Sequence, residues 1–198
     1  MAARLFLAST SRYRALLLER LGLPFSIESP GVDESLDGSE GPAARALRLA
    51  GAKAAAVLAR HPESWVIGSD QVAVAAGHVL EKPGDAARCR EMLQKSSGRS
   101  VEFHTAVVLR GPVPGPLREH VDLTVVRFRR LTDREIMRYV EIDEPFDCAG
   151  GFRSEGLGVA LTRSIKSQDP TALVGLPLIW LAAALAAAGL DPLAPDQS

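Results

Sequence analysis

The sequence has little cysteine, and its histidines follow no metal-binding pattern. Its 198 residues include two cysteines, Cys89 and Cys148, which lie far apart and form no Cys-x-x-Cys motif. The four histidines are scattered, without the spacing of a zinc motif such as His-Glu-x-x-His. Cysteine usage of this kind favours a reduced, cytoplasmic protein, and a structural zinc site is not expected.

An excess of one charge and long apolar runs are also absent. The formal net charge is −1, so we expect no overall attraction to nucleic acid or to an anionic membrane. The apolar stretch Leu5–Ala8 is too short for the core of a signal peptide, and Leu176–Leu190 is shorter than the roughly 20 residues of a membrane span. We therefore expect no targeting or transmembrane segment, and we interpret the second stretch as a buried closing helix that begins near Pro177.

The length is that of one domain over residues 1–198, or of two small lobes that share a core. β-branched alternation and short apolar runs predict strands over Arg4–Ala8, Phe25–Glu28, Trp65–Ile67, Gln71–Ala75, Val79–Leu80, Val101–Arg110, Leu117–Arg130 and Leu157–Leu161. Helical spacing predicts helices over Arg12–Leu21, over Pro42–Arg60, from the cap Asp85 to about Lys95, and from the capping box of Thr132 and Glu135 to about Tyr139. The arginines near the end of the longest predicted strand are expected on its solvent side: Arg127, Arg129 and Arg130.

Three polar residues follow the apolar run of Trp65–Ile67: Ser69, Asp70 and Gln71. We expect this strand to end at Gly68, because glycine often interrupts a strand. In an open α/β sheet, ligands bind at the carboxyl ends of the strands, so Asp70 is well placed to act as a base or a metal ligand. The alternative is an aspartate that caps a turn or a helix at the end of the strand.

A hydroxyl-rich loop joins the first predicted strand to the first predicted helix. Ser9 and Ser11 lie in this loop, Ser11 is a good N-cap, and Arg14 follows in the first helical turn. Such a junction presents unpaired backbone N–H groups and the positive end of the helix dipole, which suits a phosphate group. No Walker A motif occurs in the sequence. Arg14 therefore either faces a bound anion or is an ordinary surface arginine.

Further charged residues lie in loops and on the second predicted helix. Asp33 and Glu34 form an acidic pair in a loop, Lys53 lies on the helix, and Lys82 precedes Pro83, which holds it in an extended conformation. The acidic pair is expected to be solvated unless the fold brings it beside Asp70, where paired carboxylates can hold a hard divalent cation. Together these groups indicate a metal–phosphate site for a phosphoester or a phosphoanhydride.

Seven short segments resemble motifs of the Maf family of nucleoside triphosphate pyrophosphatases. They are Leu7–Leu17, Val32–Glu34, Lys53–Ala54, Gly68–Gln71, Glu81–Pro83, Ala149–Gly156 and Leu173–Leu178. The resemblance extends in order from Leu5 to Leu193. It implies an α/β fold of the Maf/inosine-triphosphatase type, with an elongated mixed sheet flanked by helices and a cleft between two lobes. It also implies a homodimer that hydrolyses a nucleoside triphosphate to the monophosphate and pyrophosphate, with Mg²⁺ or Mn²⁺ as the cofactor.

The same resemblance implies roles for individual residues. Asp70 would accept a proton from water or hold the metal, and Glu34 would share the metal. The residues implied in binding the triphosphate are Ser9, Ser11, Arg14, Lys53 and Lys82. One position departs from the family pattern, because Arg12 stands where the family usually has proline. Arg12 would either change the start of the helix or add a phosphate contact.

Three positions resemble the branch of the family that hydrolyses 7-methyl-GTP: Tyr13, Gln71 and Glu155. A 7-methylated guanine is cationic, so the ring of Tyr13 would attract it, and the Glu155 carboxylate would accept hydrogen bonds from its N–H groups. Alternatively, Tyr13 packs within the protein and Glu155 is a surface acid. The expected function is the removal of modified nucleotides. The alternatives are a dTTP/UTP pyrophosphatase of the same family and a non-catalytic, nucleotide-binding regulator of cell division.

Overall fold

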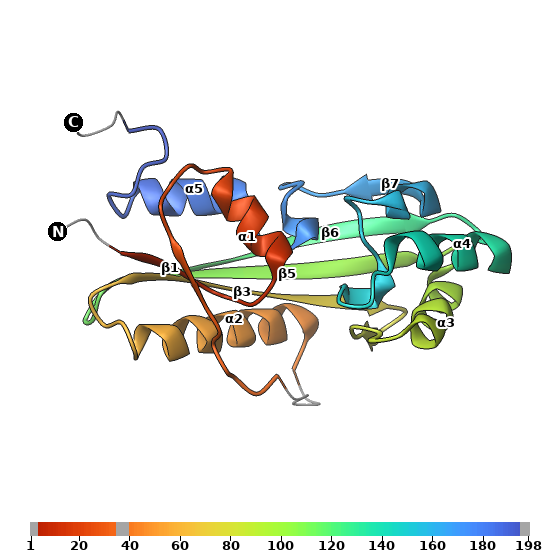
Figure 1. Ribbon diagram of the computed structural model, residues 1–198, viewed down its shortest axis with the longest axis horizontal. Coiled ribbons are helices and arrows are strands. Elements are labelled where there is room, and N and C mark those ends of the chain that lie inside the picture. Colours follow the sequence, from red (N-terminus) through yellow and green to blue (C-terminus); the bar gives the residue numbers. More distant parts are fainter. Residues whose placement is uncertain (1–3, 35–39, 195–198) are drawn as a thin grey trace. The chain divides into compact units, whose positions relative to one another are not determined.

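The computed structural model describes residues 4–34 and 40–194 (Figure 1). The strands are β1 (Leu5–Ala8), β2 (Ser26–Glu28), β3 (Trp65–Ala75), β4 (His78–Leu80), β5 (Ser100–Arg110), β6 (Leu117–Phe128) and β7 (Thr162–Lys166). The α-helices are α1 (Arg12–Glu19), α2 (Pro42–Leu58), α3 (Ala86–Ser96), α4 (Asp133–Asp143) and α5 (Leu178–Ala186). Three short 3₁₀ helices complete the described structure: η1 (Ala149–Gly151), η2 (Leu157–Leu161) and η3 (Ala172–Val174).

The strands form one mixed sheet in the order β2-β1-β3-β5-β6-β7, and β4 pairs with β3 outside this path. Strand β1 is parallel to both β2 and β3, whereas β4 is antiparallel to β3 and β7 is antiparallel to β6. A mixed sheet flanked by helices confirms the predicted α/β class.

The chain divides into two compact units. The first comprises Met1–Asp70, Thr105–Asp122 and Asp169–Ser198, and the second comprises Gln71–His104 and Leu123–Gln168. Three long strands, β3, β5 and β6, supply residues to both units. That the whole chain is a single domain stays a prediction.

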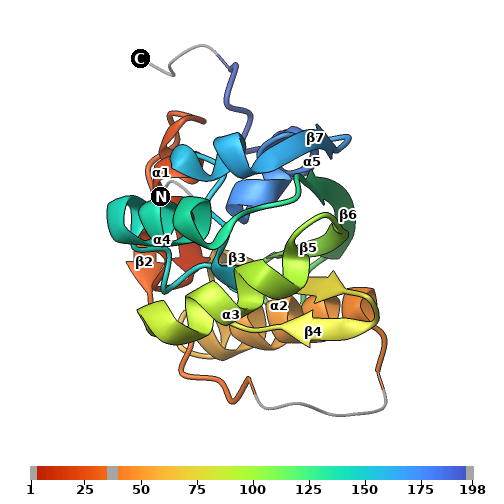
Figure 2. The same cartoon turned by 90° about the vertical axis from the view of Figure 1, so that its right-hand side faces the viewer.

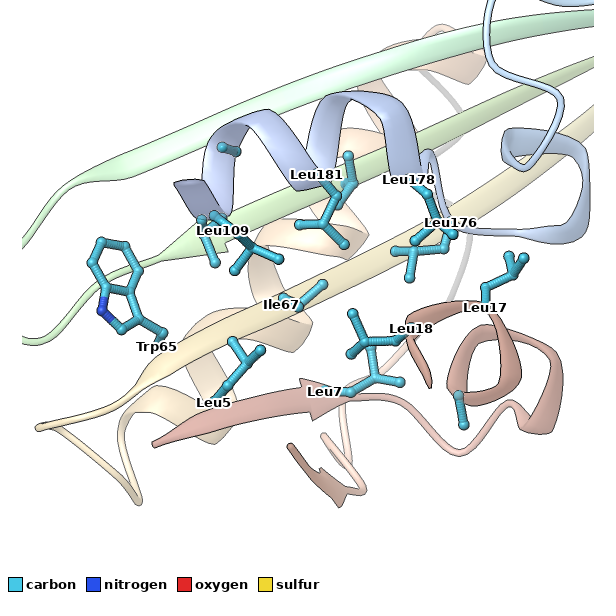
Figure 3. Close-up of a cluster of buried hydrophobic side chains, with 14 residues drawn as sticks. Leu5, Leu7, Leu17, Leu18, Trp65, Ile67, Leu109, Leu176, Leu178 and Leu181 are labelled. Atoms are coloured by element: carbon cyan, nitrogen blue, oxygen red, sulfur yellow. The ribbon is translucent and has the colours of Figure 1, made fainter. Parts of the chain in front are cut away.

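In the first unit, α1 and α5 cover one face of the sheet and α2 covers the other (Figure 1). Leu7, Ile67 and Leu109, from three neighbouring strands, are fully buried on the first of these faces. Figure 3 shows Leu18 of α1 and Leu181 of α5 packed over them. The apolar face of α5 confirms the predicted buried closing helix. No helix within residues 4–34 and 40–194 is both long and apolar enough to cross a membrane.

In the second unit, α3 and α4 lie side by side (Figure 2). Helix α4 begins with the predicted capping box, because Glu135 N donates to Thr132 Oγ1 at 3.3 Å and Thr132 N donates to Glu135 Oε2 at 2.8 Å. The core of this unit contains three phenylalanines, with Phe152 packed 6.0 Å from Phe103 and 5.2 Å from Phe128 between ring centroids.

Two strand predictions were wrong. β3 does not end at Gly68 but continues as one strand from Trp65 to Ala75. Residues Leu157–Leu161 form the 3₁₀ helix η2, and the strand is the following segment, β7. The start of η2 lies close to the preceding turn, because a Cβ on Gly158 would lie 2.2 Å from the carbonyl oxygen of Arg153.

Tyr139 joins α4 to the last residue of η1 and to the segment that follows it. Its side chain is buried, its hydroxyl donates to the carbonyl oxygen of Gly151 at 3.1 Å, and it accepts a hydrogen bond from Arg153 N at 2.9 Å. Burial raises the pKa of Tyr139 far above its usual value, so the hydroxyl stays protonated at physiological pH.

We expect Tyr139→Phe to lower the free energy of unfolding by about 1.5 kcal/mol, because the substitution leaves two backbone groups without their buried partner. Urea unfolding followed by far-UV circular dichroism measures this change. An unchanged midpoint would show that water replaces the lost hydroxyl at no cost.

Candidate active site

Strand β3 and helix α2 bring a buried ammonium group and a buried carboxylate together. Lys53 Nζ donates to Asp70 Oδ1 at 2.7 Å. Both residues are almost inaccessible to solvent, at 5 % for Lys53 and 7 % for Asp70. Charged groups at such depth need a partner of opposite charge, and this ion pair supplies one to each of them.

Gly68 makes this pairing possible. A Cβ on Gly68 would lie 2.1 Å from the carbonyl oxygen of Ala50 and 2.9 Å from the Cβ of Ala54. Helix α2 therefore lies directly on the backbone of β3, at a distance that only glycine permits. Lys53, about one helical turn after Ala50, consequently reaches Asp70, two residues beyond Gly68 on the strand.

Glu34 joins this pair from the loop after β2. Its Oε1 lies 2.5 Å from Lys53 Nζ, and its side chain is half exposed. Arg45 on α2 holds the loop from the other side, because its Nη2 donates to the carbonyl oxygen of Glu34 at 3.3 Å. The fold thus brings Glu34 of the acidic pair beside Asp70. Asp33 is exposed in the same loop.

A second cluster lies between β1 and α1. Ser11 is the N-cap of α1 as predicted, and its Oγ accepts from Arg14 N at 3.5 Å. Ser9 is buried, and its Oγ accepts from Ser11 N at 3.1 Å and from Arg14 Nη1 at 3.5 Å. The two hydroxyl groups and the guanidinium therefore gather at the N-terminal end of α1, where the helix dipole favours an anion.

Burial lowers the pKa of the Arg14 guanidinium, whereas the nearby carboxylates of Asp70 and Glu34 raise it. The charge of Arg14 therefore interacts with both acids of the first cluster. The two clusters form one charged site within the first unit.

The sequence predictions assigned no role to Ser69 and Gly175, which hold Arg14 in place. Arg14 Nε donates to the carbonyl oxygen of Gly175 at 3.0 Å. Ser69 Oγ lies 2.8 Å from the same oxygen and 2.7 Å from the carbonyl oxygen of Ala106. Gly175 has a φ of 122°, which favours glycine, and a Cβ there would lie 3.3 Å from Arg14 Nε. The sequence did contain a signal for Gly175, because this glycine is part of the segment Leu173–Leu178 that resembles a Maf motif.

Tyr13 is half-buried at the start of α1 and contacts its neighbour Arg12. The Arg12 guanidinium carbon lies 4.8 Å from the centroid of the Tyr13 ring, and Arg12 Nη2 donates to Tyr13 Oη at 2.9 Å. Arg12 stands where the family usually has proline, and α1 still begins there, directly after its N-cap Ser11. The start of the helix is therefore regular without the proline. Arg12 instead places a cation on the face of Tyr13.

The remaining predicted site residues, Gln71, Lys82 and Glu155, belong to the second unit. Gln71 is half-buried and directly follows Asp70 in β3. Lys82 is exposed in the segment after β4, and Glu155 is exposed and accepts from Ser154 Oγ at 2.7 Å.

No group of three or more histidine, cysteine, aspartate or glutamate side chains is arranged to hold a metal ion in the described part of the chain. Asp70 and Glu34, however, both reach the single position of Lys53 Nζ. Two carboxylates that converge in this way suit a cation such as Mg²⁺, which takes its other ligands from water and substrate phosphates. The arrangement combines a proton acceptor with cationic groups for an anion.

Comparison with known proteins agrees with this geometry. Residues 4–188 match the family described as Maf-like protein. A Bordetella avium protein named 7-methyl-GTP pyrophosphatase is 52 % identical over 191 residues, which cover 96 % of this chain and 95 % of the relative. A Xanthomonas oryzae pv. oryzae protein of the same name is 54 % identical, covering 96 % of this chain and 98 % of the relative. The chain belongs to the Maf family.

Proposed function

We propose that this protein is a nucleoside triphosphate pyrophosphatase that hydrolyses 7-methyl-GTP to 7-methyl-GMP and pyrophosphate. The observation that carries the proposal is the buried pair of Lys53 and Asp70, with Glu34 beside it and the anion-binding end of α1 in the same unit. The names of the relatives support the choice of nucleotide.

Asp70 is the proposed proton acceptor. Water attacks one of the two phosphorus atoms joined by the α–β bridge, the bridge breaks, and the carboxylate takes a proton from the water. General-base assistance of this kind is worth about 10²–10⁴-fold in rate. The hydrogen bond from Lys53 fixes the carboxylate on the rigid strand β3, which keeps its orientation constant during the reaction.

The cationic and hydroxyl groups are proposed to bind the triphosphate. Arg14, with Ser9 and Ser11, offers charged and neutral donors at the N-terminus of α1. Lys53 neutralises charge that develops as the bridge breaks, and the same role is proposed for Lys82.

Asp70 and Glu34 are proposed to hold a divalent cation, Mg²⁺ or Mn²⁺, together with phosphate oxygens of the substrate. The fit rests on their shared contact with Lys53 Nζ, at 2.7 Å for Asp70 and 2.5 Å for Glu34. When bound, the cation neutralises phosphate charge and polarises the bond that is cleaved. When no cation is bound, Lys53 Nζ holds the carboxylates of Asp70 and Glu34 together.

Tyr13, Gln71 and Glu155 are proposed to select the base. The Arg12 guanidinium carbon lies 4.8 Å from the centroid of the Tyr13 ring, which supports the proposal that this ring attracts a positive charge. A cationic methylguanine would take such a position, and Glu155 and Gln71 would accept from or donate to its polar edge.

The identity of the products tests the proposed reaction. We expect purified protein with Mg²⁺ to convert 7-methyl-GTP to 7-methyl-GMP and pyrophosphate in equal amounts, with no free phosphate. EDTA should abolish turnover, and added Mg²⁺ or Mn²⁺ should restore it. Release of phosphate and 7-methyl-GDP would assign cleavage to the other bridge and contradict the proposal. Nucleotide binding without turnover would support the non-catalytic alternative instead.

A further inference from the structure

A cavity of about 540 Å³ lies in the second unit, at the end of the sheet where β5 begins and β6 ends. Its lining includes four arginines, contributed by three strands and their connections: Arg99, Arg127, Arg130 and Arg163. Gly98, Ser100 and Phe128 complete the lining. All these residues belong to the second unit, whereas the proposed catalytic residues Lys53 and Asp70 belong to the first.

The backbone of three segments holds the arginines together. Phe128 N donates to the carbonyl oxygen of Arg99 at 2.9 Å, which joins the end of β6 to the start of β5. On the other side of β6, Arg127 pairs with Ser164 and Phe128 pairs with Thr162, so Arg163 is the extra residue of a β-bulge. Bulges change the direction of a side chain, and this one places Arg163 in the cavity lining.

The four guanidinium groups have no carboxylate partner among the described residues. Within residues 4–34 and 40–194, the side chains of Arg99, Arg127, Arg130 and Arg163 make no hydrogen bond or ion pair. Arg129, between two of them in sequence, donates from Nη2 to Glu135 Oε1 at 3.0 Å and from Nε to the carbonyl oxygen of Ala160 at 2.8 Å. Like charges on neighbouring strands repel each other, so this cluster is destabilising unless an anion binds to it.

We propose that this cavity is a second anion site that binds an oligophosphate: free pyrophosphate or tripolyphosphate, or the phosphate chain of a nucleotide. Guanidinium groups match phosphate oxygens in charge and in bidentate geometry. The net charge of the chain is only −1, so the positive potential here is a local feature and not a property of the whole protein.

The lining favours recognition of phosphate over recognition of a base. Phe128, the aromatic residue of the lining, is 3 % exposed and packs edge-on against Phe152, so it offers no stacking surface. Binding of single-stranded nucleic acid depends strongly on such stacking. Ser100 adds a hydroxyl group that can donate to a phosphate oxygen.

Amide NMR of the full-length protein tests the proposal, because it separates this cavity from the proposed active site. We expect tripolyphosphate to shift the amide signals of Ser100, Arg127 and Phe128 in a saturable manner at low ionic strength. The variant Arg127→Gln/Arg163→Gln should weaken this binding by at least about tenfold, because two charge-assisted contacts are lost. The charge-matched control Arg134→Gln/Arg138→Gln, which changes two exposed arginines of α4 outside the cavity, should leave the affinity unchanged.

A non-hydrolysable 7-methyl-GTP analogue distinguishes the two sources of oligophosphate. Tighter binding of the analogue than of tripolyphosphate at these amides assigns the site to nucleotides, and equal or weaker binding assigns it to free oligophosphate. The proposal is overturned if these amides do not shift, if the shifts do not saturate, or if both double variants bind as the wild type does. It is also overturned if an oligonucleotide binds there more tightly than tripolyphosphate.

Discussion

Asp70→Asn is expected to lower the turnover of 7-methyl-GTP by about 10²–10⁴-fold, because an amide cannot accept the proton from the attacking water. The variant should still fold, since asparagine retains an oxygen for the hydrogen bond from Lys53 and Glu34 still pairs with the ammonium. Steady-state release of pyrophosphate measures the loss, and thermal unfolding reports on the fold.

Asp122→Asn is a matched control for this substitution. Asp122 is as deeply buried as Asp70, lies in the first unit, and accepts through Oδ2 from Asp169 N at 3.3 Å. Its amide variant should retain turnover within a few fold. If Asp70→Asn retained the wild-type rate, or if both variants lost it equally, Asp70 would not be the base.

Gly68→Ala is expected to lower the free energy of unfolding by about 3 kcal/mol, as overpacking against a rigid backbone does. The new methyl group would lie 2.1 Å from the carbonyl oxygen of Ala50, so α2 would have to move away from β3. For a chain of this size, the melting temperature should fall by roughly 6–12 °C. Turnover should fall as well, because Lys53 moves with the helix.

Gly51→Ala, in the same helix, is the control. A Cβ on Gly51 would meet no atom within 4 Å, and α2 is regular there. Replacing a helical glycine with alanine should stabilise the protein by about 0.5–1 kcal/mol. The two variants should therefore shift the melting temperature in opposite directions. A Gly68→Ala protein as stable and active as the wild type would show that the contact between α2 and β3 adapts without cost.

Features that depend on a few consecutive residues could be predicted from the sequence. Ser11 and Thr132 are N-caps in the structure because each side chain accepts from a backbone N–H three residues later. Strand β1 and helix α5 also follow the apolar pattern of the sequence, because all four residues of β1 are buried and α5 buries Leu178, Leu181 and Leu185.

Gly68 shows where local signals failed. In a single sequence, a glycine after an apolar run is typical of a strand end, and nothing near Gly68 indicates that the predicted helix upstream packs directly on it. Its actual role, to admit the backbone of α2, depends on a long-range contact with Ala50. The error over Leu157–Leu161 has a similar origin, since the glycines on either side of Leu157 serve close approaches to Asp143 and Arg153.

The sequence indicated which residue types the candidate site contains, but not which of their side chains are in contact. Lys53 had no signal of its own within an alanine-rich helix, and only the resemblance to the Maf family indicated a role. The contacts of Lys53 with Glu34 and Asp70, and the link from Arg14 through Gly175 to Ser69, join segments that are far apart in the chain. Such contacts depend on the packed fold and not on local propensity.

The selectivity of the protein among nucleotides tests the central claim most directly. We would measure kcat/KM for pyrophosphate release from 7-methyl-GTP, GTP, dTTP and UTP, each with Mg²⁺. The account predicts the highest value for 7-methyl-GTP, about tenfold above GTP, which corresponds to the attraction of a cationic base to an aromatic ring. A higher value for dTTP or UTP would contradict the account and favour the pyrimidine branch of the family.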